Sequence, residues 1–138
     1  MLDWILAILA VTGFCISTYF TAIAYRWIDP TASYLPGFCR MAEKTCSSVI
    51  FTPRARVFGV PNSVLGQIYY VSLLAGLASR LLWQEPFFTA ALGAAAATVL
   101  LGIYLTHSLI FRTRIPCRLC FTSHGINAAI FLLLLAER

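Results

Sequence analysis

The pair of cysteines nearest the C-terminus has the spacing of a redox-active dithiol. Cys117 and Cys120 are separated by two residues and open the last apolar run of the chain. If that run is a helix, the two thiols share a face with His124 and Asn127. Two thiols one turn apart can form a disulfide with little backbone movement. The partial positive charge of a helix start favours the reactive thiolate, so this stretch is suited to thiol–disulfide exchange.

Three further cysteines precede this pair. Cys15 lies inside the first apolar run, where an inert buried thiol is expected. Cys39 and Cys46 lie in a long connecting segment. Four paired cysteines allow three interpretations: a dithiol relay, a four-cysteine zinc site, or structural disulfides without turnover. The six residues between Cys39 and Cys46 are more than the usual zinc spacing, so we expect no metal and favour the relay.

Composition indicates where this chemistry takes place. The chain has 138 residues, of which 60% are apolar and only 11% are charged. A soluble domain carries about 25% charged residues. Apolar runs longer than about 18 residues are typical of membrane spans. Four such runs cover residues 4–25, 62–83, 87–111 and 117–136. We therefore expect one all-α membrane domain over residues 1–138, built as a bundle of four transmembrane helices.

The connection over residues 26–61 is too polar and too often interrupted by proline to span a membrane. It is also too rich in aromatic and β-branched residues to be a disordered linker, and long connections of this kind are usually functional. We expect an ordered cap loop on the bundle. With four spans, this loop and the start of the last span lie on the same side of the membrane, so all four paired cysteines meet there.

A relay inside a membrane needs an electron acceptor that dissolves in the membrane. His124 and Asn127 are costly in hydrocarbon unless they serve a ligand or a partner. A quinone has two carbonyl groups, to which Asn62 and His124 can donate, and apolar side chains can hold its ring and tail. Asn127 has the alternative role of joining two helices, and Asn62 that of capping the second span. The net charge is +5, but the sequence contains no soluble basic domain that could bind a duplex. We therefore expect no nucleic-acid partner.

Taken in order, these motifs resemble the vitamin K epoxide reductase family over nearly the whole chain. The residues that carry the resemblance are Thr12-Gly13, Ser17, Tyr19, Cys39, Cys46-Ser47, Phe58-Gly59, Asn62-Ser63, Gly66, Tyr70, Gly102, Tyr104-Leu105, Cys117-Arg118-Leu119-Cys120 and Ile126-Asn127. The resemblance implies a quinone pocket inside the bundle, with the loop as its cap. It also implies that Cys120 faces the quinone and pairs with Cys117. Cys46 would exchange with Cys117, and Cys39 would meet an external thiol donor.

The resemblance also implies a set of quinone-binding residues. Asn62 matches the family's hydrogen-bonding asparagine, and His124 stands where vertebrate members have a tyrosine that contacts the quinone. Thr52 falls where the family has a small hydroxyl residue. The expected site is completed by Tyr70, Leu65, Phe58 and Asn127. Because we see no fused thioredoxin-like domain, we expect a separate thioredoxin-like protein as the thiol donor.

We therefore expect a membrane thiol:quinone oxidoreductase that generates disulfides in its partner. The alternatives are a vitamin K quinone or epoxide reductase proper and a membrane zinc-binding or scaffold protein. Stable disulfides and the family favour an extracytoplasmic or lumenal cysteine side. The positive-inside rule favours the cytoplasm. The expected cysteine side carries eight of the ten basic residues, and the other side only Arg80 and Arg138.

Overall fold

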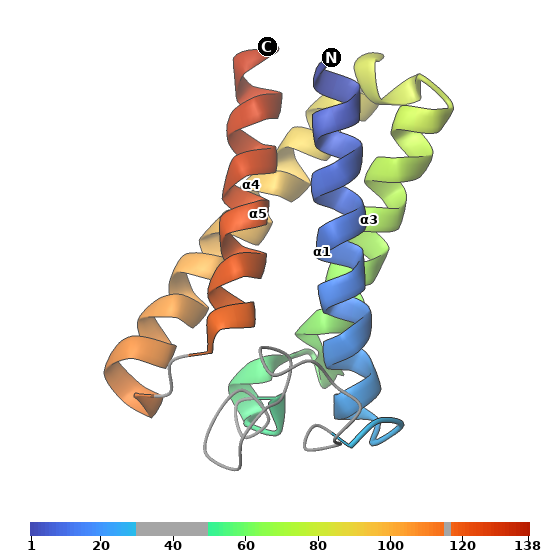
Figure 1. The fold of residues 1–138 in the computed structure, drawn as a ribbon. Helices are drawn as coiled ribbons and strands as arrows, with labels where there is room; N and C mark the ends of the chain where they lie inside the picture. Colours follow the sequence, from blue (N-terminus) through green and yellow to red (C-terminus); the bar gives the residue numbers. More distant parts are fainter. Residues whose placement is uncertain (30–49, 115–116) are drawn as a thin grey trace.

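The computed structural model describes residues 1–29, 50–114 and 117–138, without the side chains of Arg54 and Thr113. Most of the expected cap loop, with Cys39 and Cys46, lies outside these residues. Four long helices form the body of the described part: α1 (Leu2–Ala24), α3 (Asn62–Ala78), α4 (Phe87–His107) and α5 (Arg118–Ala136). The helices lie side by side, and both chain termini are at the end of the bundle opposite the start of α5 (Figure 1).

The packing of the helices leaves one seam of the bundle open. α1 packs along α3 and against α5, and α5 packs along α4, whereas α3 and α4 make little contact. A shared core of Leu6, Ala10, Tyr70, Ile130 and Leu134 joins α1, α3 and α5, and each of these side chains is almost completely buried. The space between the loosely packed α3 and α4 is available for a ligand.

Three of the described helical segments are long and apolar enough to cross a membrane by length and composition. They are α1, α4 with its extension to Arg112, and α5. The expected second span over residues 62–83 is a continuous helix only as far as Ala78. Arg80 has φ +59°, and a short 3₁₀ helix follows at Leu81–Trp83. Because the apolar run continues through this turn, its length predicted a longer helix than the structure has.

The chain between α4 and α5 is described as far as Arg114. A π-helical turn, η3 (Ser108–Thr113), extends α4, and Arg114 then takes the left-handed conformation. At the same end of the bundle, a 3₁₀ turn, η1 (Pro53–Ala55), leads into a two-stranded hairpin, β1 (Arg56–Val57) and β2 (Val60–Pro61), which precedes α3. These segments surround the end of the bundle that carries the C-terminal cysteine pair.

Polar side chains hold α1 against α3. Thr21 Oγ1 donates to Ser63 Oγ at 2.9 Å and lies 3.3 Å from Gln67 Oε1. Gln67 Nε2 donates to Thr18 Oγ1 at 2.9 Å. Small residues let the two helices approach, since a Cβ on Gly66 would lie 2.8 Å from Ser17 Oγ. This network fixes the first turn of α3, where Asn62 lies.

Candidate functional site

A cavity of about 310 Å³ lies between the four helices near the end where α5 starts. All four helices and the segment over residues 50–61 contribute to its walls. Its volume is at the lower end of the range of small-molecule sites, about 300–1,000 Å³. Among the described residues, no lysine, arginine, aspartate or glutamate lines it. The cavity therefore suits a neutral, largely apolar molecule with a few hydrogen-bonding groups.

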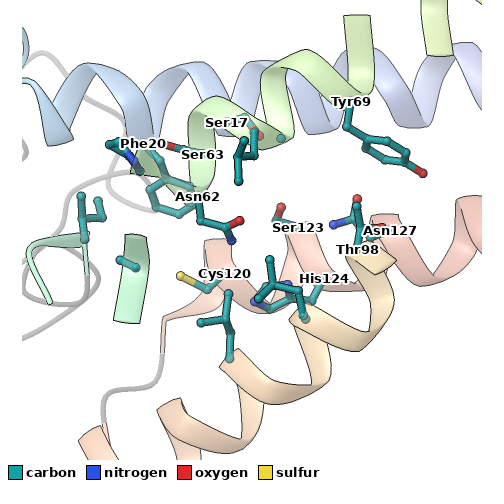
Figure 2. A pocket seen from close by; sticks show the side chains of 18 of the residues that line it. Ser17, Phe20, Asn62, Ser63, Tyr69, Thr98, Cys120, Ser123, His124 and Asn127 are labelled. Carbon is teal, nitrogen blue, oxygen red and sulfur yellow. The ribbon is translucent and has the colours of Figure 1, made fainter. Parts of the chain in front are cut away.

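The structure brings most of the expected quinone-binding residues to this cavity. They come from separate parts of the chain, and six of the seven line it: Thr52, Asn62, Leu65, Tyr70, His124 and Asn127. Cys120 lines it as well. Cys120 and Asn62 lie at one end of the cavity, Thr98 and Asn127 lie deeper, and His124 lies between them (Figure 2).

Phe58 is the expected residue that the structure does not bring to the cavity. Its side chain is fully exposed. Phe58 and Gly59 form the two-residue turn of the hairpin, with φ values of +52° and +83°. Positive φ at both central positions is the geometry of the tight turns that match strand twist. This geometry holds the phenyl ring on the outside of the turn, away from the bundle interior.

The two cysteines at the start of α5 differ in their chemical state. Cys117 is fully buried and disulfide-bonded, whereas Cys120 is a free thiol. Because Cys15 is also free, the disulfide partner of Cys117 lies outside the described residues. Cys117 Sγ accepts the backbone N–H of Cys120 at 3.4 Å and so caps the start of α5. The arrangement places a disulfide sulfur and a free thiol one helical turn apart, with the free thiol at the cavity.

Asn62 is free to contact a ligand. It is the first residue of α3, and the residue that caps this helix is Pro61, without a side-chain hydrogen bond. Among the described residues the Asn62 side chain has no hydrogen-bond partner, although it lines the cavity. The geometry therefore argues against the alternative in which Asn62 only caps α3. Its amide group is available to a carbonyl oxygen in the cavity.

Asn127 has both of the roles considered for it. It lines the cavity, and its Oδ1 accepts a 2.6 Å hydrogen bond from the hydroxyl of Tyr70. Tyr70 is almost completely buried, and its ring packs against Gly13 of α1. The bond leaves the Asn127 Nδ2 group as the donor with which this residue can meet a ligand.

The imidazole of His124 packs closely against α4. A Cβ on Gly102 would lie 3.0 Å from the Nδ1 atom of the imidazole. Nδ1 is buried and has no hydrogen-bond partner among the described residues. Buried polar atoms without a partner are uncommon and call for an explanation, such as a ligand or a catalytic role.

Sequence reasoning missed several polar side chains of the cavity wall, namely Ser17, Ser63, Tyr69, Thr98 and Ser123. Ser123 could have been found, because it lies between Cys120 and His124 at the start of a membrane span. Ser17 belongs to a stripe of small residues that equally well indicates plain helix packing. Thr98 is an isolated hydroxyl in an alanine-rich helix, and no pattern in the sequence indicates that it faces Tyr69 across the open seam.

Comparison with known proteins decides the family. A family model described as "Vitamin K epoxide reductase family" matches residues 4–135, nearly the whole chain. The chain belongs to the vitamin K epoxide reductase family. No curated protein matches it in a direct comparison. Family membership and the three apolar spans make it an integral membrane oxidoreductase. The family uses quinones as substrates, and the volume and the neutral lining of the cavity fit such a molecule.

Proposed function

We propose that this protein is a thiol:quinone oxidoreductase that makes disulfides in a separate thioredoxin-like partner and passes the electrons to a quinone. The observation that carries the proposal is the free Cys120 thiol at a neutral membrane cavity, one turn from the disulfide-bonded Cys117. Cys120 is positioned to exchange electrons with a molecule in the cavity. Cys117 is positioned to exchange disulfides with a thiol from outside the bundle.

The relay that we propose balances its atoms and electrons. The partner's dithiol reduces the pair formed by Cys39 and Cys46, and the partner leaves as a disulfide. A Cys46 thiolate then attacks Cys117 Sγ in a Cys117–Cys120 disulfide, and Cys120 is released. Cys39 next attacks Cys46 and releases Cys117. The resulting Cys117–Cys120 dithiol gives two electrons and two protons to the quinone, which becomes a hydroquinone, and the disulfide re-forms.

The described state of α5 supports this order of events. In the middle of the exchange, Cys117 is bonded to a sulfur other than Cys120, and Cys120 is free. Both conditions hold here. In the quinone-binding part of the site, Asn62 donates a hydrogen bond to one carbonyl oxygen of the quinone, and His124 donates a hydrogen bond to the other. Leu65 and the apolar wall of α4 hold the ring and the tail.

Reconstitution of the purified protein in lipid vesicles tests the proposal. With a dithiol as donor and a short-tailed quinone as acceptor, we expect hydroquinone to form in a one-to-one ratio with disulfide. The same assay with vitamin K epoxide in place of the quinone distinguishes the epoxide reductase alternative, which requires the epoxide to be consumed. Metal analysis tests the zinc alternative. Stoichiometric zinc together with no quinone-dependent thiol oxidation would contradict the proposal.

A further inference from the structure

The described wall of the main cavity contains one side chain of a type that gains and loses protons near neutral pH. The titratable side chains in its described wall are Tyr69, Tyr70, Cys120 and His124. Tyrosine and cysteine side chains ordinarily titrate near pH 10 and 8.5, whereas imidazole titrates near 6.5. Reduction of a quinone to a hydroquinone requires two protons as well as two electrons. His124 is therefore the side chain in this wall whose type is suited to carrying a proton.

The groups around His124 that the structure describes give it no fixed hydrogen-bond or charge partner. On α5, Cys120 lies one turn away, and on α3, Tyr70 is engaged with Asn127. On α4, Gly102 packs against Nδ1, and no hydrogen bond to this atom exists among the described residues. The titratable neighbours that face the imidazole across a cavity are thus Cys120, Tyr69 and Tyr70, together with His107 on the other side of α4.

His124 also separates two cavities. A second cavity of about 300 Å³ lies along α4 and α5 and shares His124 and Gly102 with the first. Its wall includes His107 and Thr106, and no lysine, arginine, aspartate or glutamate among the described residues. The ring of His107 packs against that of Phe111 in a tilted arrangement, with ring centroids 4.7 Å apart, and His107 does not line the main cavity. The chain thus offers a second histidine, on the neighbouring helix, that lies outside the proposed quinone site.

We propose that His124 transfers a proton to one quinone oxygen during reduction, in addition to holding that oxygen by a hydrogen bond. The inference rests on the proposed thiol:quinone activity. As Cys117 and Cys120 form their disulfide, two electrons and two protons leave the thiols. One proton passes from Cys120 to the nearer oxygen. His124 gives a proton from a ring nitrogen to the other oxygen and takes up the proton released from Cys117, so the imidazole ends as it began.

A single-turnover experiment isolates this step from thiol exchange with the donor. The full-length protein in lipid vesicles is reduced with dithiothreitol, freed of reductant and mixed with a short-tailed quinone, and hydroquinone formation is followed by absorbance. His124→Gln keeps an N–H donor but cannot carry a proton near neutral pH. We expect its rate to fall by about 100-fold, in the range of general acid–base catalysis. The quinone concentration for half-maximal rate should stay within about threefold, because the donor remains.

A second variant separates proton transfer from a structural role. His124→Ala leaves space for a small molecule, and we expect added imidazole to restore its rate by at least about tenfold. The rate of the unaltered protein should vary between about pH 5 and about pH 7.5, below the range in which thiols titrate, and that of His124→Gln should be nearly flat over this range. His107→Phe is the matched control and should match the unaltered protein in both rate and pH profile.

The outcomes distinguish this inference from the function on which it rests. If the reduced, unaltered protein is not oxidised by quinone, the proposed function itself is wrong. If it is oxidised and His124→Gln keeps its rate and pH profile, then His124 only donates a hydrogen bond and the inference is overturned. A slow His124→Ala that imidazole does not rescue overturns it as well, since the imidazole would then have only a structural role.

Discussion

The hydroxyl of Tyr70 donates a 2.6 Å hydrogen bond to Oδ1 of Asn127, and this bond joins α3 to α5 two turns along α5 from Cys120. Gly13 of α1 lies against the ring of the same tyrosine. Three helices therefore meet at one side chain. The position of Asn127 in the cavity wall depends on this contact, so the stability of the bundle and the shape of the site are linked here.

We expect Tyr70→Phe and Asn127→Ala to be coupled in stability. In a double-mutant cycle, the coupling free energy between hydrogen-bonded side chains in a membrane bundle averages about 0.6 kcal/mol and reaches about 1.7 kcal/mol. The short distance favours a value in the upper part of this range. The measurement is reversible unfolding of the four proteins in mixed detergent micelles. Purely additive effects would show that the bond does not contribute to stability.

Gly13→Ala should destabilise the protein by steric overlap. The added Cβ would overlap Cζ of Tyr70, so the buried ring must move and its bond to Asn127 must weaken. Overpacking of this kind typically costs about 1–3 kcal/mol. The matched control is Gly93→Ala in α4, where an added Cβ meets no atom within 4 Å. The control should be neutral or slightly stabilising, and equal loss of stability in both variants would argue against the steric explanation.

Asn62→Ala should weaken quinone turnover without unfolding the protein. The side chain makes no cap bond for α3, so its removal costs the helix little, whereas a ligand carbonyl loses a donor. A net hydrogen bond contributes about 0.5–1.5 kcal/mol, which predicts a three- to tenfold loss in kcat/KM. Gln84→Ala, which removes an exposed amide directly after the 3₁₀ helix at Leu81–Trp83, is the control. Unchanged quinone kinetics for Asn62→Ala would place the quinone elsewhere.

Cys120→Ser should arrest the relay at a defined disulfide. In Cys120→Ser, the Cys117 thiolate can still attack a Cys39–Cys46 disulfide at Cys46 and release Cys39, but no Cys120 thiol is present to displace Cys46 from Cys117, so the bond between Cys117 and its partner sulfur should accumulate. Mass spectrometry of peptides under non-reducing conditions would identify that partner, which we expect to be Cys46. Quinone reduction should be abolished in Cys120→Ser and also in Cys117→Ser. Full activity of either variant would rule out the relay.

Cys39→Ser tests the order of the relay. We expect it to block electron transfer from a thioredoxin-like protein but to spare reduction by a small membrane-permeant dithiol, which can reach the later cysteines directly. Cys15→Ser is the control, because this free thiol lies on α1 away from the cavity, and it should be nearly silent. Equal loss of both activities in Cys39→Ser would place this cysteine at a different step.

The side of the membrane on which the cysteines lie can be measured at the hairpin. Stable disulfides and the family favour the outside, and the eight basic residues of that side favour the cytoplasm. We propose the outside. Phe58→Cys in an otherwise cysteine-free protein places a thiol on a fully exposed turn. Labelling of intact cells by a membrane-impermeant maleimide is the expected result. Labelling only after lysis would show that the protein faces the cytoplasm.

Much of the site could be predicted because it lies on regular elements. The spacing of Cys120, His124 and Asn127 fixed their common face once α5 was recognised as a helix, and all three line the cavity. The opposite wall of the cavity was harder to predict, since the contribution of Thr98 depends on how loosely α3 and α4 pack. The placement of Phe58 was wrong because a two-residue turn, and not hydrophobicity, sets the direction of its ring. The end of α3 was missed for a similar reason, as Arg80 breaks the helix inside an apolar run.

The early end of α3 has a consequence for the surrounding lipid. At 1.5 Å per residue, its 17 residues span about 26 Å, less than the hydrocarbon thickness of about 30 Å in a typical bilayer. Hydrophobic mismatch of this size is relieved by local thinning of the bilayer beside the short helix. The thinning would occur along the loosely packed seam between α3 and α4. We therefore expect turnover to depend on acyl-chain length, with the highest activity in vesicles of shorter-chain lipids.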